Sequence, residues 1–68
     1  MAYLVADYWA EPPANIKPHW RIVAYSESLI HAKGFALRDS IVVHVLDNGE
    51  AWRAYKAKRL PDHYTIVS

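Results

Sequence analysis

The sequence predicts a single α+β domain spanning residues 1–68: a four- to five-stranded antiparallel sheet with one helix packed on one face. Three observations support this. Runs of strand-forming residues are separated by turn-forming residues, one central stretch repeats apolar residues at helical spacing, and a chain of 68 residues holds one core. A hydrophobic content of 53% is sufficient for that core. The expected order is strand, strand, helix, strand, strand and a short last strand.

The first two expected strands flank a proline-rich connection. Residues 2–9 are rich in strand formers, and residues 11–18 contain three of the four prolines, which cannot donate to a strand ladder. Residues 19–25 then form the second strand, with Trp20 and Ile22 on one face. A proline-rich loop between two strands is therefore expected at this end of the sheet.

The helix is expected over residues 27–38, with Ser26 as its N-cap. Leu29, Ala32 and Ala36 lie near one line of that helix and would face the sheet. The next segment, residues 40–46, contains three consecutive β-branched residues and is the clearest strand signal in the chain.

Asn48-Gly49 is typical of a type I′ turn and predicts a hairpin that returns as a fourth strand over residues 50–56. Residues 63–67 form a short edge strand. Alternation along the fourth strand directs Trp52 and Ala54 toward the helix. The opposite, exposed face of the sheet is then expected to carry Tyr3, Val5, Arg21, Tyr25, His44, Arg53 and Tyr55.

Positive charge is concentrated near the end of the chain. Residues 51–68 hold four basic and one acidic side chain, whereas residues 1–50 hold four basic and six acidic ones. A cationic, aromatic segment of this kind is suited to phosphate or to an acidic protein groove. A charged edge that prevents sheets from pairing is the competing interpretation. The predicted partner-binding residues are Arg53, Tyr55, Lys56, Lys58 and Arg59, with a second basic patch formed by His31, Lys33 and Arg38.

The length and composition of the chain favour a binding protein over an enzyme. A chain this short has little material for a water-excluding pocket, so we expect no enzyme activity. The four histidines lack metal-ligand spacing and cysteine is absent, so we expect no metal and no cofactor. The longest apolar run, residues 1–6, is too short for a bilayer, so we expect no membrane contact and a cytoplasmic location.

Two parts of the sequence resemble small phage-encoded anti-CRISPR proteins, and are most similar to short inhibitors of type I, in particular type I-F, CRISPR surveillance complexes. The helix pattern Leu-x-x-Ala-Lys-x-x-Ala is matched from Leu29 to Ala36, and the hairpin pattern Trp-x-Ala-Tyr-Lys is matched from Trp52 to Lys56. The proline-rich loop and the last residues have no counterpart in the resemblance.

This resemblance implies a non-enzymatic inhibitor in the host bacterial cell. It would dock on the backbone subunits of the protein–crRNA complex and block target DNA hybridisation, with Lys33, Tyr55 and Lys56 in the contact. Two alternatives remain open. One is a small nucleic-acid-binding domain that uses the basic, aromatic sheet face. The other is a homodimeric regulatory protein whose sheet face is buried between subunits, so the chain is expected to be a monomer or a homodimer.

Overall fold

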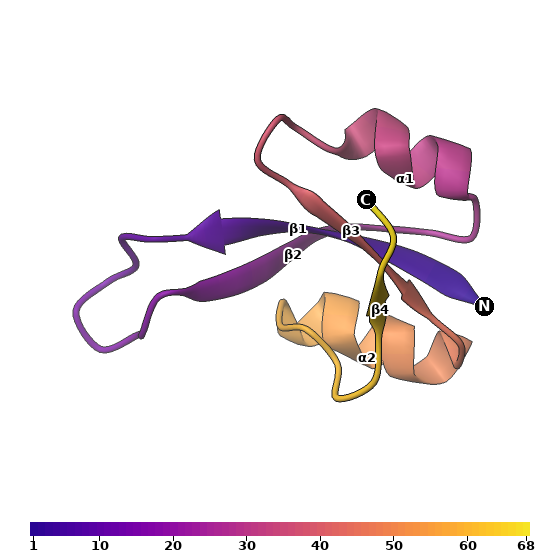
Figure 1. Cartoon of the computed structure of the whole chain (residues 1–68). Helices are drawn as coiled ribbons and strands as arrows, with labels where there is room; N and C mark the ends of the chain where they lie inside the picture. Colours follow the sequence, from indigo (N-terminus) through magenta and orange to yellow (C-terminus); the bar gives the residue numbers. More distant parts are fainter.

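The computed structural model describes all 68 residues as an antiparallel sheet with a helix on each side (Figure 1). The strands lie in the order β2-β1-β3-β4, and every neighbouring pair is antiparallel. The elements are β1 (Ala2–Trp9), β2 (His19–Ser26), α1 (Leu29–Phe35), β3 (Ile41–Val45), α2 (Asn48–Ala57) and β4 (Thr65–Ile66). The α+β class and the four-stranded antiparallel sheet are therefore confirmed.

The segment expected to be the fourth strand is helix α2, so the prediction of a hairpin over residues 47–56 is wrong. Asp47 caps the helix: its Oδ1 accepts a hydrogen bond from the backbone N–H of Gly49 at 2.8 Å. Ala51 and Ala54, three residues apart, are the buried residues of α2. Burial at helical spacing and a side-chain cap together outweigh the local turn signal.

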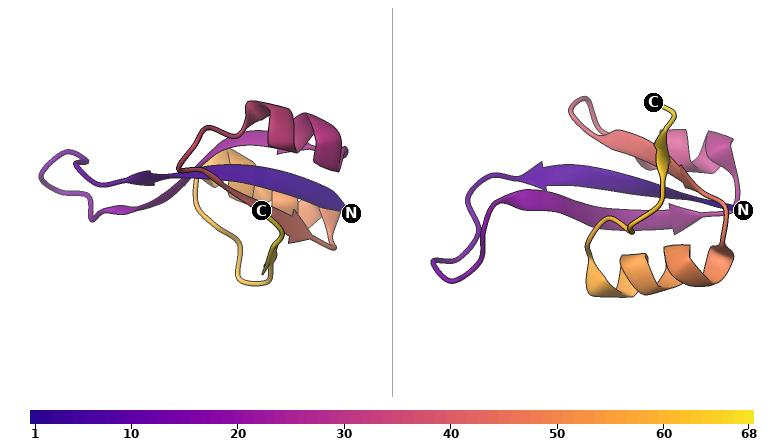
Figure 2. Two further views of the ribbon diagram at one scale, coloured as in Figure 1. Left: turned by 45° about the horizontal axis from the view of Figure 1, so that its top comes forward. Right: turned by 60° about the horizontal axis from the view of Figure 1, so that its bottom comes forward.

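The two helices cover opposite faces of the sheet, as Figures 1 and 2 show. Alternate residues of β1, which lies inside the sheet, point to each side. Leu4 packs in one cluster with Ala51 and Ala54 of α2, and Val5 packs in the other with Ala32 of α1. The expected arrangement with one helix and an exposed sheet face is thus wrong. Helix α1 covers the face of Val5 that was expected to be exposed, and the second helix, α2, covers the opposite face, which includes Ile22.

A β-bulge in β2 changes which of its side chains face α2. Val5 pairs with Ala24, but the next residue, Ala6, pairs with Ile22, so Val23 has no partner in β1. Because of this extra residue, Tyr25 packs against the same core cluster as Ile22. Strict alternation placed Tyr25 on the other face, and that prediction is wrong.

Helix α1 is shorter than the expected residues 27–38. Its N-cap is Ser28, not Ser26, and the Ser28 hydroxyl accepts a hydrogen bond from the N–H of His31 at 3.3 Å. The helix ends at Phe35, and its C-cap residue, Ala36, is extended. Strands β3 and β4 lie inside the predicted ranges 40–46 and 63–67. Only eleven residues are buried, and all are hydrophobic, so the core is small.

Candidate binding surface on helix α2

The structure divides the eight predicted partner-binding residues between the two sides of the sheet. Arg53, Tyr55, Lys56, Lys58 and Arg59 lie on α2 or directly after it, whereas His31, Lys33 and Arg38 lie on α1 or after it. Because the sheet separates these helices, the two groups form no common surface (Figure 2). The larger group is the candidate site.

The C-terminal half of α2 carries the cations. Arg53 and Lys56 are exposed and lie one turn apart on the helix. Lys58 ends the helix in the left-handed conformation, with φ 59° and ψ 35°. The chain then turns back, and the N–H of Arg59 donates to the carbonyl of Ala54 at 3.2 Å. This C-cap holds Lys58 and Arg59 beside the last turn of the helix.

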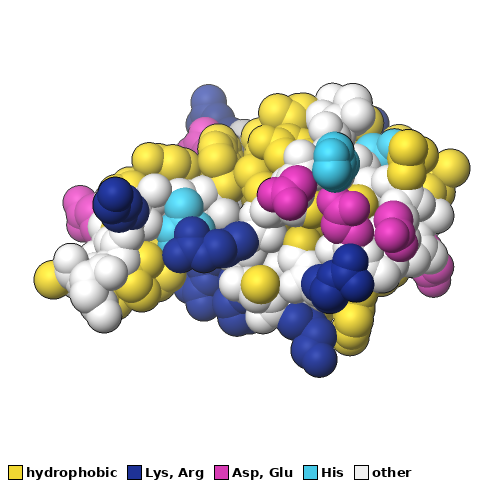
Figure 3. Space-filling model, turned by 90° about the horizontal axis from the view of Figure 1, so that it is seen from below, with side chains coloured by type: hydrophobic (Ala, Val, Ile, Leu, Met, Phe, Trp, Pro, Cys, Tyr) yellow, Lys and Arg dark blue, Asp and Glu magenta, His cyan; other side chains and the backbone are white.

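None of these cations is neutralised within the protein. The molecule has a single ion pair, between His63 Nδ1 and Glu50 Oε1 at 3.7 Å, and it involves neither lysine nor arginine. Figure 3, which looks onto the α2 side, shows dark-blue basic side chains gathered next to a separate group of acidic ones. The guanidinium and ammonium groups of α2 are therefore free to bind an external anion.

Three aromatic rings, those of Tyr25, Trp52 and Tyr55, form a cluster on the same helix surface as these cations. The Trp52 ring lies 5.3 Å from the Tyr25 ring, edge to face, and 5.4 Å from the Tyr55 ring. Trp52 is 49% exposed, so the expectation that it lies in the core is wrong. Tyr55 is half-buried against the core and does not point outward with Arg53, because neighbours two apart diverge on a helix. We refer to Tyr25, Trp52, Arg53, Tyr55, Lys56, Lys58 and Arg59 as the α2 surface.

The α2 surface continues toward the hairpin of β1 and β2. A hollow of about 420 Å³ lies between Arg59, Leu60 and the aromatic pair of Tyr8 and Trp20. Those two rings meet edge to face with centroids 5.4 Å apart. Sequence patterns did not single out Tyr8 or Trp20 as binding residues, since only the folded chain brings them next to Arg59.

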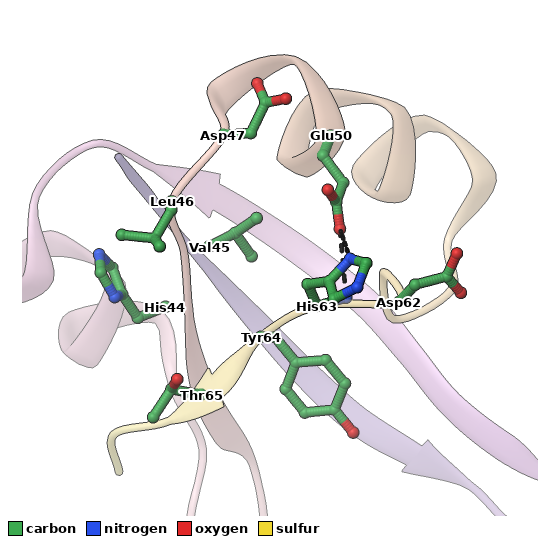
Figure 4. Close-up of a pocket in the computed structure, with 9 residues that line it drawn as sticks. All are labelled: His44, Val45, Leu46, Asp47, Glu50, Asp62, His63, Tyr64 and Thr65. Atoms are coloured by element: carbon green, nitrogen blue, oxygen red, sulfur yellow. Dashed lines mark hydrogen bonds and ion pairs between the residues drawn. The ribbon is translucent and has the colours of Figure 1, made fainter.

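At the other end of α2 lies an acidic hollow of about 400 Å³ (Figure 4). Glu50 Oε1 accepts a hydrogen bond from the backbone N–H of His63 at 3.2 Å, in addition to its contact with the imidazole. Figure 4 shows Asp47 and Asp62 on either side of Glu50, and His44 across the hollow from Asp62. No group of three or more histidine and carboxylate side chains could hold a metal ion. The contacts between Glu50 and His63 hold the chain that follows α2 against the first turn of the helix.

These features define a small α+β domain with a cationic, aromatic helix surface. No protein-family model, no curated protein and no solved structure matches the chain. Of the two segments that resemble anti-CRISPR proteins, the second, Trp52 to Lys56, is helical and does not form the hairpin that the resemblance implies. Neither helix is long and apolar enough to cross a membrane.

Proposed function

We propose that this chain is a non-enzymatic binding protein whose α2 surface docks on an anionic site of a nucleoprotein complex and competes there with nucleic acid. The observation that carries the proposal is the set of four cations within residues 53–59, none of which has a carboxylate partner in the protein. Free arginine and lysine side chains recognise phosphate and acidic grooves, and they accelerate encounter with such partners.

The aromatic residues of the α2 surface add apolar contact area to the electrostatic attraction of the cations. Half of the Trp52 side chain is exposed, and its ring is held by Tyr25 and Tyr55, so little conformational freedom is lost on binding. Tryptophan and arginine are the residues that most often dominate the energy of an interface. Trp52 and Arg53, which are adjacent in the sequence, are therefore the expected anchors.

The particular complex that we propose, from the resemblance, is a type I CRISPR surveillance complex in a bacterial cell. The α2 surface would lie on its backbone subunits and block the path of target DNA. Tyr55 and Lys56 belong to this surface, whereas Lys33 is on the far side of the sheet and is not part of the same footprint. The contact is accordingly assigned to α2 alone.

A structural role is the competing explanation for the same cations. Positive side chains in the last turn of a helix complement its dipole by about 0.3–1 kcal/mol each. Lys56 lies in the last turn of α2, and Lys58 caps it. If this were their only role, reversing their charge would lower stability and leave partner binding by the folded protein unchanged.

The test measures how the protein inhibits target-DNA binding by a purified, crRNA-loaded surveillance complex. The variant Lys56→Glu/Lys58→Glu/Arg59→Glu is expected to lose at least about tenfold in affinity. A matched control, Lys17→Glu/Lys33→Glu/Arg38→Glu, changes the net charge equally at other sites and is expected to bind normally. Circular dichroism establishes that both variants are folded. Equal binding by both triple variants would refute the assignment to α2.

Direct binding of free nucleic acid is a second candidate, and the same uncompensated cations favour it. The version that uses an exposed sheet face is excluded, because a helix covers each face. Four phosphate contacts on duplex DNA give a slope of about −3.6 for log affinity against log salt concentration. Tight oligonucleotide binding with such a slope, and no effect on the surveillance complex, would replace the first proposal by the second.

A further inference from the structure

The hollow beside the loop end of the β1–β2 hairpin contains a cation and exposed aromatic surface but no acidic residue. Six residues line its volume of about 420 Å³, among them Arg59 and Tyr8, and none of the six is Asp or Glu. Tyr8 is 53% exposed. Figures 1 and 2 show that the hairpin extends beyond both helices and that α2 ends on the same side. We refer to the space between Tyr8, Trp20, Arg59 and Leu60 as the hairpin hollow.

The walls of the hairpin hollow are held in place by the core. Tyr8 and Trp20 are cross-strand partners, and their rings meet edge to face. Trp20 and Leu60 both pack against the core cluster that lies under α2. The backbone of Arg59 is held on both sides, by Leu60 and by its own hydrogen bond to Ala54. Little conformational freedom is therefore lost when a ligand enters the hollow.

Arg59 connects the hairpin hollow to the other cations of the α2 surface. It also lines a second hollow, of about 380 Å³, together with Arg53. Glu50 and Asp62 line that second hollow and oppose its two arginines, whereas the hairpin hollow has Arg59 and no carboxylate. An anion therefore meets uncompensated positive charge in the hairpin hollow.

The cations of α2 lie between two aromatic sites on the same side of the sheet. One is the hairpin hollow, and the other is the three-ring cluster that includes Tyr25. Trp20 pairs with Tyr8 and Tyr25 pairs with Leu4, so the two sites are roughly 13 Å apart along β1. Rings that alternate with cations match the alternation of bases and phosphates in an unpaired nucleic-acid strand.

We propose that the hairpin hollow binds one nucleotide of an unpaired strand, with the base against the Tyr8 ring and the phosphate on the Arg59 guanidinium. A single nucleotide uses both groups, because its base stacks on an aromatic ring and its phosphate accepts paired hydrogen bonds from arginine. Duplex DNA offers phosphates but keeps its base faces stacked inside, and an acidic peptide offers Arg59 a carboxylate but no base to stack. The inference rests on the proposed function for its biological partner: within the nucleoprotein complex, the anionic site is an unpaired strand.

Fluorescence anisotropy of a labelled oligo(dT) strand, titrated with the full chain, tests the hairpin hollow. A strand of about 20 nucleotides covers the usual length of a single-strand site. We expect this strand to bind at least about tenfold more tightly than its duplex with oligo(dA), because pairing withdraws the base faces from the Tyr8 ring.

Substitutions at Tyr8 separate stacking on the ring from packing in the fold. Tyr8→Leu keeps an apolar side chain without a ring and should weaken strand binding about tenfold, while Tyr8→Phe should bind like the parent. Tyr64→Leu is the matched control, because Tyr64 is 42% exposed and lies outside the hollow. Arg59→Gln should reduce the salt slope by about 0.7, the share of one phosphate contact on a single strand, and Lys33→Gln on α1 should leave it unchanged. All four positions are exposed, and circular dichroism checks that each variant is folded.

Equal affinity for the strand and the duplex would overturn the proposal, and so would unchanged strand binding by the folded Tyr8→Leu variant. A poly-glutamate peptide that binds as tightly as the strand, and is weakened by the same variants, would assign the hollow to an acidic protein instead. The titration contains no surveillance complex, so the two proposals fail separately. A protein that binds the strand without inhibiting the complex contradicts the proposed function alone, and one that inhibits the complex without binding the strand contradicts the hairpin hollow alone.

Discussion

The left-handed conformation of Lys58 allows a sharp test of helix α2. Its φ of 59° and ψ of 35° place the Cβ of an L-residue close to the following carbonyl group, at a cost of about 1 kcal/mol that glycine avoids. Two residues earlier, Lys56 lies inside the helix, where glycine is about 1 kcal/mol worse than alanine. Replacing each lysine by glycine and by alanine should therefore give opposite preferences.

At position 58 we expect Lys58→Gly to be about 1 kcal/mol more stable than Lys58→Ala, and at position 56 the order should reverse by a similar amount. The charge lost is the same within each pair, so its effect cancels. For a domain of this size, about 1 kcal/mol shifts the unfolding midpoint by roughly 4–8 °C, which thermal circular dichroism resolves. If glycine is the less stable residue at both positions, the left-handed cap at Lys58 is refuted.

Three other stability predictions use the same assay. Asp47→Ala should lower the free energy of unfolding by about 1 kcal/mol, because it removes the cap on Gly49, and Asp47→Ser should retain most of it. Leu4→Ala should lower the free energy of unfolding by about 3 kcal/mol, because Leu4 is fully buried under α2. That is a large part of the total free energy of unfolding, roughly 3–10 kcal/mol, expected for a chain of this length. Ala51→Leu should lower the free energy of unfolding by about 1–3 kcal/mol, because the larger side chain overpacks a buried position. Arg53→Leu, on the exposed side of the same helix, is the control and should change the free energy of unfolding by no more than about 0.5 kcal/mol. An Ala51→Leu variant as stable as the parent would contradict the close packing of α2 on the sheet.

The strands were predictable because their signals are local. Alternation and β-branched residues identified residues 2–9, 19–25 and 40–46 to within one residue of the observed ends. Helix α2 was missed because Asn48-Gly49 normally supplies positive φ angles for a hairpin, and here neither residue has one. A cue for the helix was present: Glu50 follows Asp47 by three residues, which is the spacing of a helix N-terminus. Alanines at 51 and 54 then occupy its buried side.

The residues of the candidate site could be predicted from the sequence, but the directions of their side chains could not. Four cations within seven positions stay close together in any regular structure, so their clustering on one element followed from the sequence. Their directions did not, because a strand and a helix orient the same residues differently: Tyr55 turns inward and Trp52 outward. Tyr25 joins them through the bulge at Val23. A one-residue irregularity depends on the pairing strand as well as on its own sequence, so periodicity cannot locate it.

The placement of two helices on opposite faces makes damage to the fold separable, by mutation, from damage to the α2 surface. Leu4 and Val5, adjacent in β1, support α2 and α1 respectively, so a change to either weakens the one small core that both helices need. Exposed substitutions act differently: a change at Lys56 alters one side of the molecule, and a change at Ile30 alters the other. A variant that loses partner binding while its free energy of unfolding is unchanged has lost the α2 surface. Loss of both properties together indicates unfolding, which distinguishes a damaged fold from a damaged site.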